Sequence, residues 1–590
     1  MNGTQNWDMS IVYEGGSSNE AFKGDLEQLF TEARSLKARS DSLPDPSEVE
    51  TWGGLLVDLY DTNLRLHEIW TWIHCLTSQN TLDKAAEVAE ERLRDCSSIL
   101  SLARIPLDDL LAFGSEEQFE ALVSLPSLSP IRGGLENIRK SAQTLLPKEQ
   151  QAICEALSND GLRAWGALYT TRSGEVTVKI DGEELSAAQA FNRVSLSRDA
   201  DERKRIFDAV GDAWKLDRDL WAKILNHITG TRITLNELRG IDTLDEPITN
   251  CRMEEASVNA MMEAIASVRA PMTRFLELKA RALGKDRLGY QDLRAPVGEF
   301  RMSHSWENSK SFILKHFKEN SRPLYDLSVR AFEERWIEAE DRAHKRQGGW
   351  CANLPISEQS RIFMTHSGGI NSTITLAHEL GHAYHNEATK GIHPAMRDYP
   401  MTLAETASTF AENLMRDAAL EAAEDDKEKL AILNARLSSA VAYLMDIPAR
   451  FAFEKRLYDL RRKGPLDPDT LDEVTVEIQR EWFGDALESW NPTFWCSKLH
   501  FYIASISFYN FPYSFGFLFS QLVYDQVRAD PEAWKERYDE LLRDTGWRTA
   551  EDIASTHLGL DLRDPEAWKS ALKPVYSDLE AFEALLDKRD

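Results

Sequence analysis

The chain has 590 residues, enough for several domains, because single hydrophobic cores stop growing at about 250–300 residues. It carries 69 Lys and Arg residues against 97 Asp and Glu residues, which gives a formal net charge of −28. This charge argues against nucleic-acid binding and against docking on anionic lipid, since both need a basic surface. A hydrophobic share of 42% is too high for a disordered chain.

The cysteines and the apolar segments predict a cytoplasmic protein without a membrane span. Six cysteines are scattered without a CxxC pair, which is typical of buried thiols in a reducing compartment. Residues 1–18 include Asp8 and Glu14 and contain no apolar run, so we expect no signal peptide. The uncharged stretch 501–524 has the length of a bilayer span, but its proline, asparagine and four serines favour a buried helical segment.

Most of the chain shows apolar residues at three- and four-residue spacing, which predicts helices. Residues 55–111 have the pattern of long amphipathic helices, and residues 124–134, rich in Ser, Pro and Gly, predict a break. Residues 176–180 (VTVKI) predict a strand, and the Asp-Gly pair that follows is typical of a type I′ hairpin turn. We therefore predict an N-terminal helical domain over residues 1–195, ending in this hairpin, and a second domain over residues 196–590.

A second β-like stretch, residues 361–365, is followed by a glycine-containing loop and then by a helix with the pattern HExxH. Its two histidines, His378 and His382, project from one helix face, so that two imidazole nitrogens can reach a single metal ion. Glu379 lies next to His378 and can take a proton from a bound water. Zinc suits this mixture of imidazole and carboxylate groups.

A catalytic zinc needs a third protein ligand and an open fourth position. The longer pattern HExxHxxGxxH does not apply, because His385 stands in place of its glycine and Ala388 in place of its third histidine. We expect His385 to lie in the core or behind the ligands. The third ligand is then expected from a glutamate on a following helix.

Glu405, in the first turn of the next predicted helix, is the best candidate for this third ligand. An alternative interpretation is structural, because Thr402 and Glu405 also have the spacing of a helix capping box. Glu412, two turns further on, has the spacing to accept a hydrogen bond from a ligand histidine, or else it faces solvent. The carboxylates that compete with Glu405 are Glu387, Asp398 and Glu412.

The sequence resembles the oligoendopeptidase F family, within the thimet-oligopeptidase-like zinc peptidases. The matching segments are TLAHELGHAYH (375–385), LAETASTFAE (403–412), HFY (500–502), FYNFPYSFG (508–516), WDMSIVY (7–13) and the hairpin VTVKIDGEEL. The resemblance implies a mainly α fold, in which two helical halves flank a deep substrate channel and a small β element lies near the HExxH helix. Residues 196–590 would then form the zinc metallopeptidase catalytic domain.

The resemblance also implies the roles of individual residues. One zinc ion per chain would be held by His378, His382 and Glu405, with Glu379 as the general base. His500 and tyrosines shortly after it would stabilise the transition state.

The aromatic segment departs from the family at one position. The family often has FYVYQYATG in this segment, so Phe511 replaces a tyrosine here and Pro512 stiffens the loop. Tyr509 and Tyr513 keep their positions, and the sequence leaves open which of them reaches the substrate oxyanion. The uncharged stretch 501–524 is expected to form a wall of the cleft.

These observations predict a zinc-dependent metalloendopeptidase that hydrolyses internal peptide bonds of short, unstructured oligopeptides. A zinc-activated water would attack the scissile carbonyl, with Glu379 as base. The substrate backbone is expected to pair with residues 361–365 as an edge strand. One alternative is a zinc carboxypeptidase or dipeptidyl carboxypeptidase, in which a cation such as Arg397 holds the free C-terminus. Another is an inactive peptide-binding protein. The sequence does not predict the oligomeric state.

Overall fold

The computed structural model describes residues 5–142, 144–158, 160–299, 305–346 and 348–588. The chain is 71% helical, which confirms the predicted mainly α class. It divides into two compact units, and each unit is built from three segments. Unit 1 is Met1–Lys148, Met302–Ala418 and Val523–Gly559; unit 2 is Glu149–Arg301, Ala419–Leu522 and Leu560–Asp590. No unit limit falls at residue 195, and the division into residues 1–195 and 196–590 stays a prediction.

Unit 1 combines long helices with a three-stranded sheet. Its helices are α1 (Glu20–Asp41), α2 (Val49–Gln79), α3 (Lys84–Phe113), α4 (Glu116–Val123), α5 (Arg132–Ala142), α14 (Trp306–Asn320), α15 (Arg322–Glu333), α16 (Ile370–Ala388), α17 (Met401–Ala422), α23 (Trp534–Asp544) and α24 (Ala550–Ile553). Its strands are β3 (Ile337–Glu338), β4 (Trp350–Leu354) and β5 (Gln359–Phe363). Helices α6 (Lys148–Ser158), α17 and α22 (Phe511–Ala529) contribute residues to both units.

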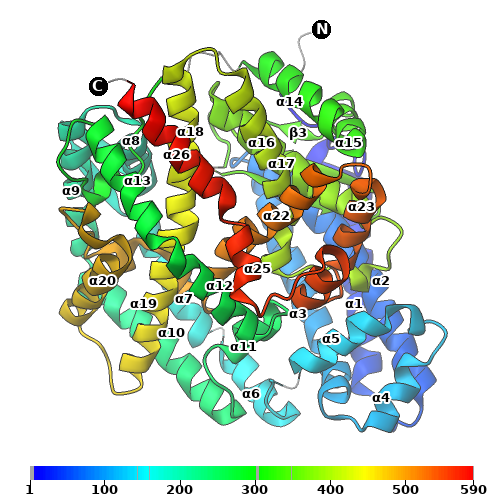
Figure 1. Cartoon of the computed structure of the whole chain (residues 1–590). Helices are drawn as coiled ribbons and strands as arrows, with labels where there is room; N and C mark the ends of the chain where they lie inside the picture. The colour runs from blue at the N-terminus through cyan, green and yellow to red at the C-terminus, as the bar shows by residue number, and fades with distance from the viewer. Residues whose placement is uncertain (1–4, 143, 159, 300–304, 347, 589–590) are drawn as a thin grey trace. The chain divides into compact units, whose positions relative to one another are not determined.

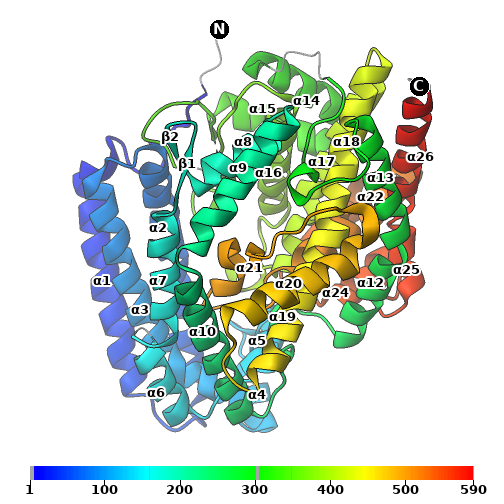
Figure 2. The same ribbon diagram turned by 90° about the vertical axis from the view of Figure 1, so that its left-hand side faces the viewer.

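The N-terminal helices of unit 1 form as the apolar spacing predicts. Leu59, Leu66, Ile69 and Ile73 recur along one stripe of α2, and all four are buried. Helices α1, α2 and α3 pack against one another around this stripe, and Figure 2 shows α1 and α3 side by side. Burying leucine and isoleucine side chains in this way stabilises the layer by about 1.5–3 kcal/mol for each residue.

The sheet of unit 1 has the strand order β3–β5–β4, and helix α16 packs against β4 and β5. Strand β5 pairs in parallel with β3 and antiparallel with β4, where Trp350 faces Phe363. The prediction that residues 361–365 form an edge strand is therefore wrong, because β5 lies in the centre and uses both edges within the sheet. Strands β3 and β4 lie at the two edges of the sheet, and an edge strand leaves one row of backbone groups unpaired within the sheet. The β element predicted near the HExxH helix is confirmed.

Helices α16 and α17 approach each other closely at Gly381. A β-carbon at this position would lie 2.5 Å from the Ala407 carbonyl oxygen and 2.6 Å from the Ser408 α-carbon. Both are backbone atoms, so only a glycine fits here without moving one helix away from the other. The glycine inside the HExxH segment thus sets the distance between the two helices that carry His378, His382 and Glu405.

Unit 2 is helical apart from one hairpin. Its elements are α6 (Lys148–Ser158), α7 (Leu162–Gly174), β1 (Thr177–Ile180), β2 (Glu183–Ser186), α8 (Ala187–Leu196), α9 (Ala200–Lys215), α10 (Arg218–Arg239), α11 (Asp245–Asn250), α12 (Glu255–Ser267), α13 (Arg269–Ala282), α18 (Asp426–Val441), α19 (Ile447–Arg461), α20 (Pro468–Phe483), α21 (Phe494–Ser497), α25 (Pro565–Ser570) and α26 (Lys573–Asp587). Figure 1 shows α26 beside α18 and α13, against which it packs.

The hairpin of unit 2 has the predicted turn. Strands β1 and β2 pair antiparallel, and Asp181 and Gly182 between them have φ angles of 51° and 86°. Two consecutive positive φ angles are what a type I′ turn requires. Val178 and Ile180 of β1 are buried in a small core.

The uncharged stretch 501–524 does not form a single helix. It contains the short helical turn η7 (Leu499–Tyr502), an irregular segment and then the start of α22. A different stretch, Asp426–Arg461, is long and apolar enough for a membrane span by length and composition. Because 61% of its most apolar window is buried within the protein, this is weak evidence for a membrane helix.

Replacing Gly381 with Ala should lower the thermal unfolding midpoint, because the added methyl group meets backbone atoms of α17. Overpacking of this kind costs about 1–3 kcal/mol. Gly24→Ala is the matched control, since Gly24 lies inside α1 and a β-carbon there would have no neighbouring atom within 4 Å. This control should be neutral or stabilising by up to about 1 kcal/mol. Equal midpoints for Gly381→Ala and the unmodified chain would show that the helices do not depend on this close approach.

Candidate metal centre

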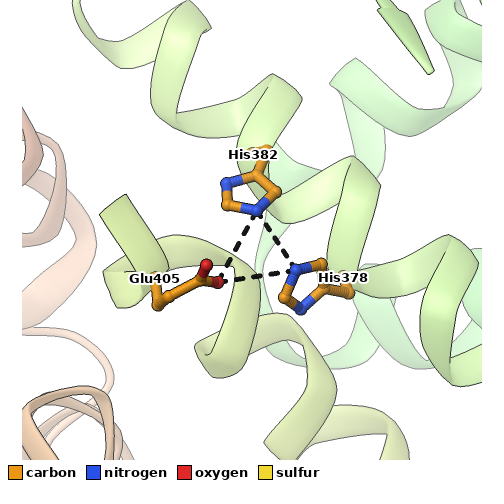
Figure 3. Close-up of side chains that lie close together, drawn as sticks. All are labelled: His378, His382 and Glu405. Atoms are coloured by element: carbon orange, nitrogen blue, oxygen red, sulfur yellow. Dashed lines mark hydrogen bonds and ion pairs between the residues drawn. The ribbon is translucent and has the colours of Figure 1, made fainter. Parts of the chain in front are cut away.

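The HExxH helix α16 turns two imidazole rings toward each other. The Nε2 atoms of His378 and His382 lie 3.1 Å apart, and the ring planes are nearly perpendicular. The two residues are one helical turn apart, so their side chains lie on the same face of α16. Figure 3 shows both rings pointing toward the Glu405 carboxylate.

Glu405 comes from the first turns of α17. Its Oε2 atom lies 3.5 Å from His378 Nε2 and 3.6 Å from His382 Nε2. The helix begins at Met401, so Thr402 lies within its first turn rather than at the N-cap position, and the capping-box interpretation is wrong. Glu405 is thus the fifth residue of α17 and does not occupy the third position, which a capping box requires.

The three side chains fit a single zinc ion. Ligand atoms about 2.0–2.1 Å from a tetrahedral zinc lie about 3.3 Å from one another. The three separations observed here, 3.1, 3.5 and 3.6 Å, bracket that value. Within the described residues this is also the one group of three or more such side chains with ligand atoms that close together. Two imidazoles and one carboxylate form a donor set that zinc takes in catalytic sites.

Glu379 lies beside this group, and one of its two carboxylate oxygens forms no hydrogen bond with the described residues. Its Oε2 atom is buried and has no hydrogen-bond partner among the described residues. Burial raises the pKa of Glu379 to about 7; the His378 charge opposes this shift, and Glu405 and Glu412 add to it. A β-carbon at Gly349, just before β4, would lie 3.2 Å from Glu379 Oε1. The carboxylate is thus close to the start of the edge strand.

Glu412 lies behind His378. Its Oε1 atom is 2.8 Å from His378 Nδ1, and its Oε2 atom is 2.7 Å from Arg416. Burial alone would raise the pKa of Glu412, but Arg416 and the His378 hydrogen bond lower it to about 2. An ionised carboxylate accepts the Nδ1–H of His378 and so leaves Nε2 of the same ring as a lone-pair donor. Of the two interpretations that the sequence left open for Glu412, the geometry favours the hydrogen bond.

Two other candidates from the sequence point away from this group. Glu387 forms ion pairs with Arg330 and with Lys390. His385 is fully buried, with Nε2 2.8 Å from Thr545 Oγ1. Burial lowers the pKa of His385 to about 3, so this ring is neutral and packs in the core.

The predicted transition-state residues lie together in unit 2. The ring centroid of His500 is 5.0 Å from that of Tyr509 and 6.0 Å from that of Tyr513, and the Tyr513 ring is stacked on it. The three residues that the sequence analysis selected therefore form one aromatic cluster in the structure. Their relation to the metal ligands of unit 1 stays a prediction.

Sequence reasoning missed three residues that the structure places next to predicted ones. Arg416 follows Glu412 by four residues, and this helical spacing could have identified it. Gly349 approaches Glu379 only through the sheet, and Asn510 contacts His500 only through a loop. No local pattern indicates either of these contacts.

Comparison with known proteins places this geometry in a family. Residues 314–574 match the model of Peptidase family M3, and residues 112–177 match that of Oligopeptidase F. The chain therefore carries a Peptidase family M3 domain and an Oligopeptidase F N-terminal domain. The resemblance to oligoendopeptidase F is confirmed, and this M3 chain is a metalloendopeptidase. The longer match contains His378, His382 and Glu405 as well as the aromatic cluster.

Several known proteins are similar to this chain in sequence or in fold. Oligopeptidase PepF of Bacillus subtilis (strain 168) is 22% identical over 536 residues, which cover 89% of this chain and 79% of the relative. The crystal structure of a putative peptidase from Chlamydophila abortus has a TM-score of 0.84 at 19% identity and covers 99% of both chains. Oligoendopeptidase-F from Enterococcus faecium has a TM-score of 0.71 at 17% identity, over 96% of this chain and 99% of its own. The structural neighbours show that the fold is shared.

The geometry of the candidate ligands predicts that zinc binding depends on Glu405 and not on Glu387. Glu405→Ala should lower zinc affinity by at least the 10- to 100-fold that accompanies loss of groups behind the ligands. Glu387→Ala is the matched control and should keep its zinc, because Glu387 pairs with Arg330 and Lys390 instead. The zinc content of both variants is measured after dialysis against a zinc buffer. Circular dichroism checks that both variants are folded. Full zinc occupancy in Glu405→Ala would remove Glu405 from the ligand set.

Proposed function

We propose that this M3 chain is a zinc-dependent endopeptidase that hydrolyses internal bonds of short, unstructured oligopeptides. The observation that carries the proposal is the triangle of His378, His382 and Glu405 ligand atoms, with the partnerless carboxylate oxygen of Glu379 beside it. The donor set suits one zinc ion per chain, and the adjacent carboxylate suits proton transfer.

Bound zinc supplies a Lewis acid, which makes water a nucleophile at neutral pH and polarises the scissile carbonyl. His378 and His382 would hold the ion through their imidazole rings, and Glu405 would hold it through its carboxylate. Glu412 fixes the His378 ring by accepting its Nδ1–H. Glu379 takes a proton from the attacking water at its free Oε2 atom and delivers it to the nitrogen of the leaving amine.

The edge of β4 is the proposed docking site for the peptide backbone. Strand β4 begins at Trp350, directly after Gly349, and Gly349 lies against the Glu379 carboxylate. A peptide that pairs with this edge as an additional strand would run past Glu379 in an extended conformation. This assignment replaces residues 361–365, of which 361–363 belong to the central strand β5 (Gln359–Phe363). An extended substrate also explains why folded proteins would be poor substrates.

The remaining roles rest on the family resemblance and on composition. Tyr509 and Tyr513 are proposed to donate hydroxyl hydrogens to the oxyanion that develops on the scissile carbonyl. A cytoplasmic location is proposed from the net charge of −28 and from six cysteines that are all free, four of them buried. Peptides are the proposed partners, and neither nucleic acid nor membrane is expected to bind.

Glu379→Gln should keep zinc and lose turnover. Glutamine has the size and polarity of glutamate but cannot take the proton, and general base catalysis contributes about 10²- to 10⁴-fold. Zinc content and kcat on a fluorogenic peptide are measured together. Glu387→Gln, on the same helix, should retain near-native kcat as the control. A Glu379→Gln enzyme with native kcat would refute the proposed base.

Peptides blocked at both ends test the endopeptidase assignment. An N-acetylated, C-amidated peptide of about ten residues should be cut at an internal bond, as mass spectrometry of the products would show. A carboxypeptidase or dipeptidyl carboxypeptidase requires the free C-terminal carboxylate and would leave this peptide intact. The same peptide with a free C-terminus is the control, and cleavage of the free form alone would favour the carboxypeptidase alternative.

A further inference from the structure

His500 is held at one edge of its ring by a buried amide. Its Nδ1 atom lies 2.7 Å from Oδ1 of Asn510, a residue with no exposed surface. The same Oδ1 atom accepts a hydrogen bond from Arg450 Nη1 at 3.4 Å. Arg450 is held in turn by an ion pair with Asp446. The four side chains form a continuous polar chain within unit 2 that ends at the His500 ring.

Arg450 determines which atom of the Asn510 amide faces this chain. A guanidinium group has only donors, so the amide atom that it contacts must be the oxygen. The flipped amide would turn an NH₂ group toward the Arg450 donors. Because Oδ1 only accepts, His500 must donate to it through Nδ1–H. The remaining ring nitrogen, Nε2, then carries a lone pair whenever the ring is neutral.

The surroundings of His500 keep the ring neutral. Burial lowers the pKa of His500 to about 4; the Asn510 hydrogen bond and Asp446 oppose this shift, and the cations Lys498 and Arg450 add to it. A neutral ring with its proton on Nδ1 cannot donate a hydrogen bond from Nε2.

The Nε2 edge of the ring is open to a ligand. No described residue forms a hydrogen bond with this atom, and the ring is only half-buried. The stacked Tyr513 ring and the Tyr509 ring, which meets His500 edge-on, hold the plane of the imidazole. A peptide backbone offers N–H groups that match such an acceptor.

We propose that Asn510 is a positioning residue that fixes His500 as the Nδ1–H tautomer, so that Nε2 accepts a hydrogen bond from a backbone N–H of the bound peptide. This assignment rests on the proposed peptidase function. It differs from the role that the family resemblance implies, because an oxyanion needs a hydrogen donor and His500 offers an acceptor. The oxyanion donors are then the hydroxyl groups of Tyr509 and Tyr513.

Nitrogen NMR of the full chain tests the tautomer without any assay of activity. The protein is labelled with ¹⁵N-histidine, and the His500 signals are assigned by their loss in His500→Gln. We expect a protonated Nδ1 and an unprotonated Nε2 at neutral pH. An Nε2–H tautomer or a charged imidazolium would overturn the proposal. Because this measurement does not depend on turnover, it distinguishes a wrong tautomer from a failure of the proposed peptidase function.

A substrate scan tests the acceptor role. Peptides that carry one N-methyl group each, at successive positions, remove one backbone N–H at a time. At one position, N-methylation should lower kcat/KM of the unmodified enzyme by roughly 3- to 10-fold, the worth of one neutral hydrogen bond. In His500→Phe this extra loss should vanish, as a double-mutant cycle measures. Equal N-methyl losses in both enzymes at every position would overturn the proposal.

Variants of Asn510 separate positioning from packing. Asn510→Asp keeps the acceptor oxygen, but its negative charge raises the His500 pKa. At a pH where the ring is neutral, this variant should preserve both the tautomer and the N-methyl coupling. Asn510→Leu has similar volume without an acceptor and should lose the coupling. If Asn510→Leu does not fold, the tautomer and the coupling in Asn510→Asp still decide. Loss of the Nδ1–H tautomer in Asn510→Asp would contradict the role of the oxygen.

Discussion

The close approach of α16 and α17 at Gly381 is the constraint on which the metal group depends. The backbone of α17 lies where a side chain at position 381 would be, and this contact brings Glu405 within 3.6 Å of both histidines. Ligands on two different helices can share one ion only if the helices hold their spacing to a few tenths of an ångström. A glycine between the two proposed ligand histidines therefore contributes to the site, although it offers no ligand atom.

Charge balance is the second requirement of this centre. Glu379, Glu405 and Glu412 all lie beside the two histidines, and buried carboxylates of like charge destabilise one another. Arg416 offsets one of these charges by pairing with Glu412. A divalent cation at the triangle would offset the others, which gives a physical reason for metal binding beyond the ligand geometry. Glu412 then serves two purposes, since it also orients the His378 ring.

The predictable part of the structure is the part that local spacing determines. The HExxH helix, the amphipathic stripe of α2 and the Asp181-Gly182 turn follow from residues close in sequence, and each is confirmed. Spacing made Glu405 the best candidate among several carboxylates, and the family resemblance singled it out, because its distance to the histidines depends on helix packing that the sequence does not display. The edge-strand prediction for residues 361–365 was wrong for the same reason: β5 is paired on both sides by strands that the local pattern did not reveal. The contact of Asn510 with His500 is equally non-local.

X-ray absorption at the zinc edge of the zinc-loaded chain tests the central claim most directly. The account predicts nitrogen and oxygen neighbours at about 2.0–2.1 Å and outer-shell scattering from two imidazole rings. It predicts no sulfur neighbour at about 2.3 Å, although the half-buried Cys351 lies in β4 near Glu379. A sulfur neighbour, or scattering from three imidazoles, would contradict the centre formed by His378, His382 and Glu405.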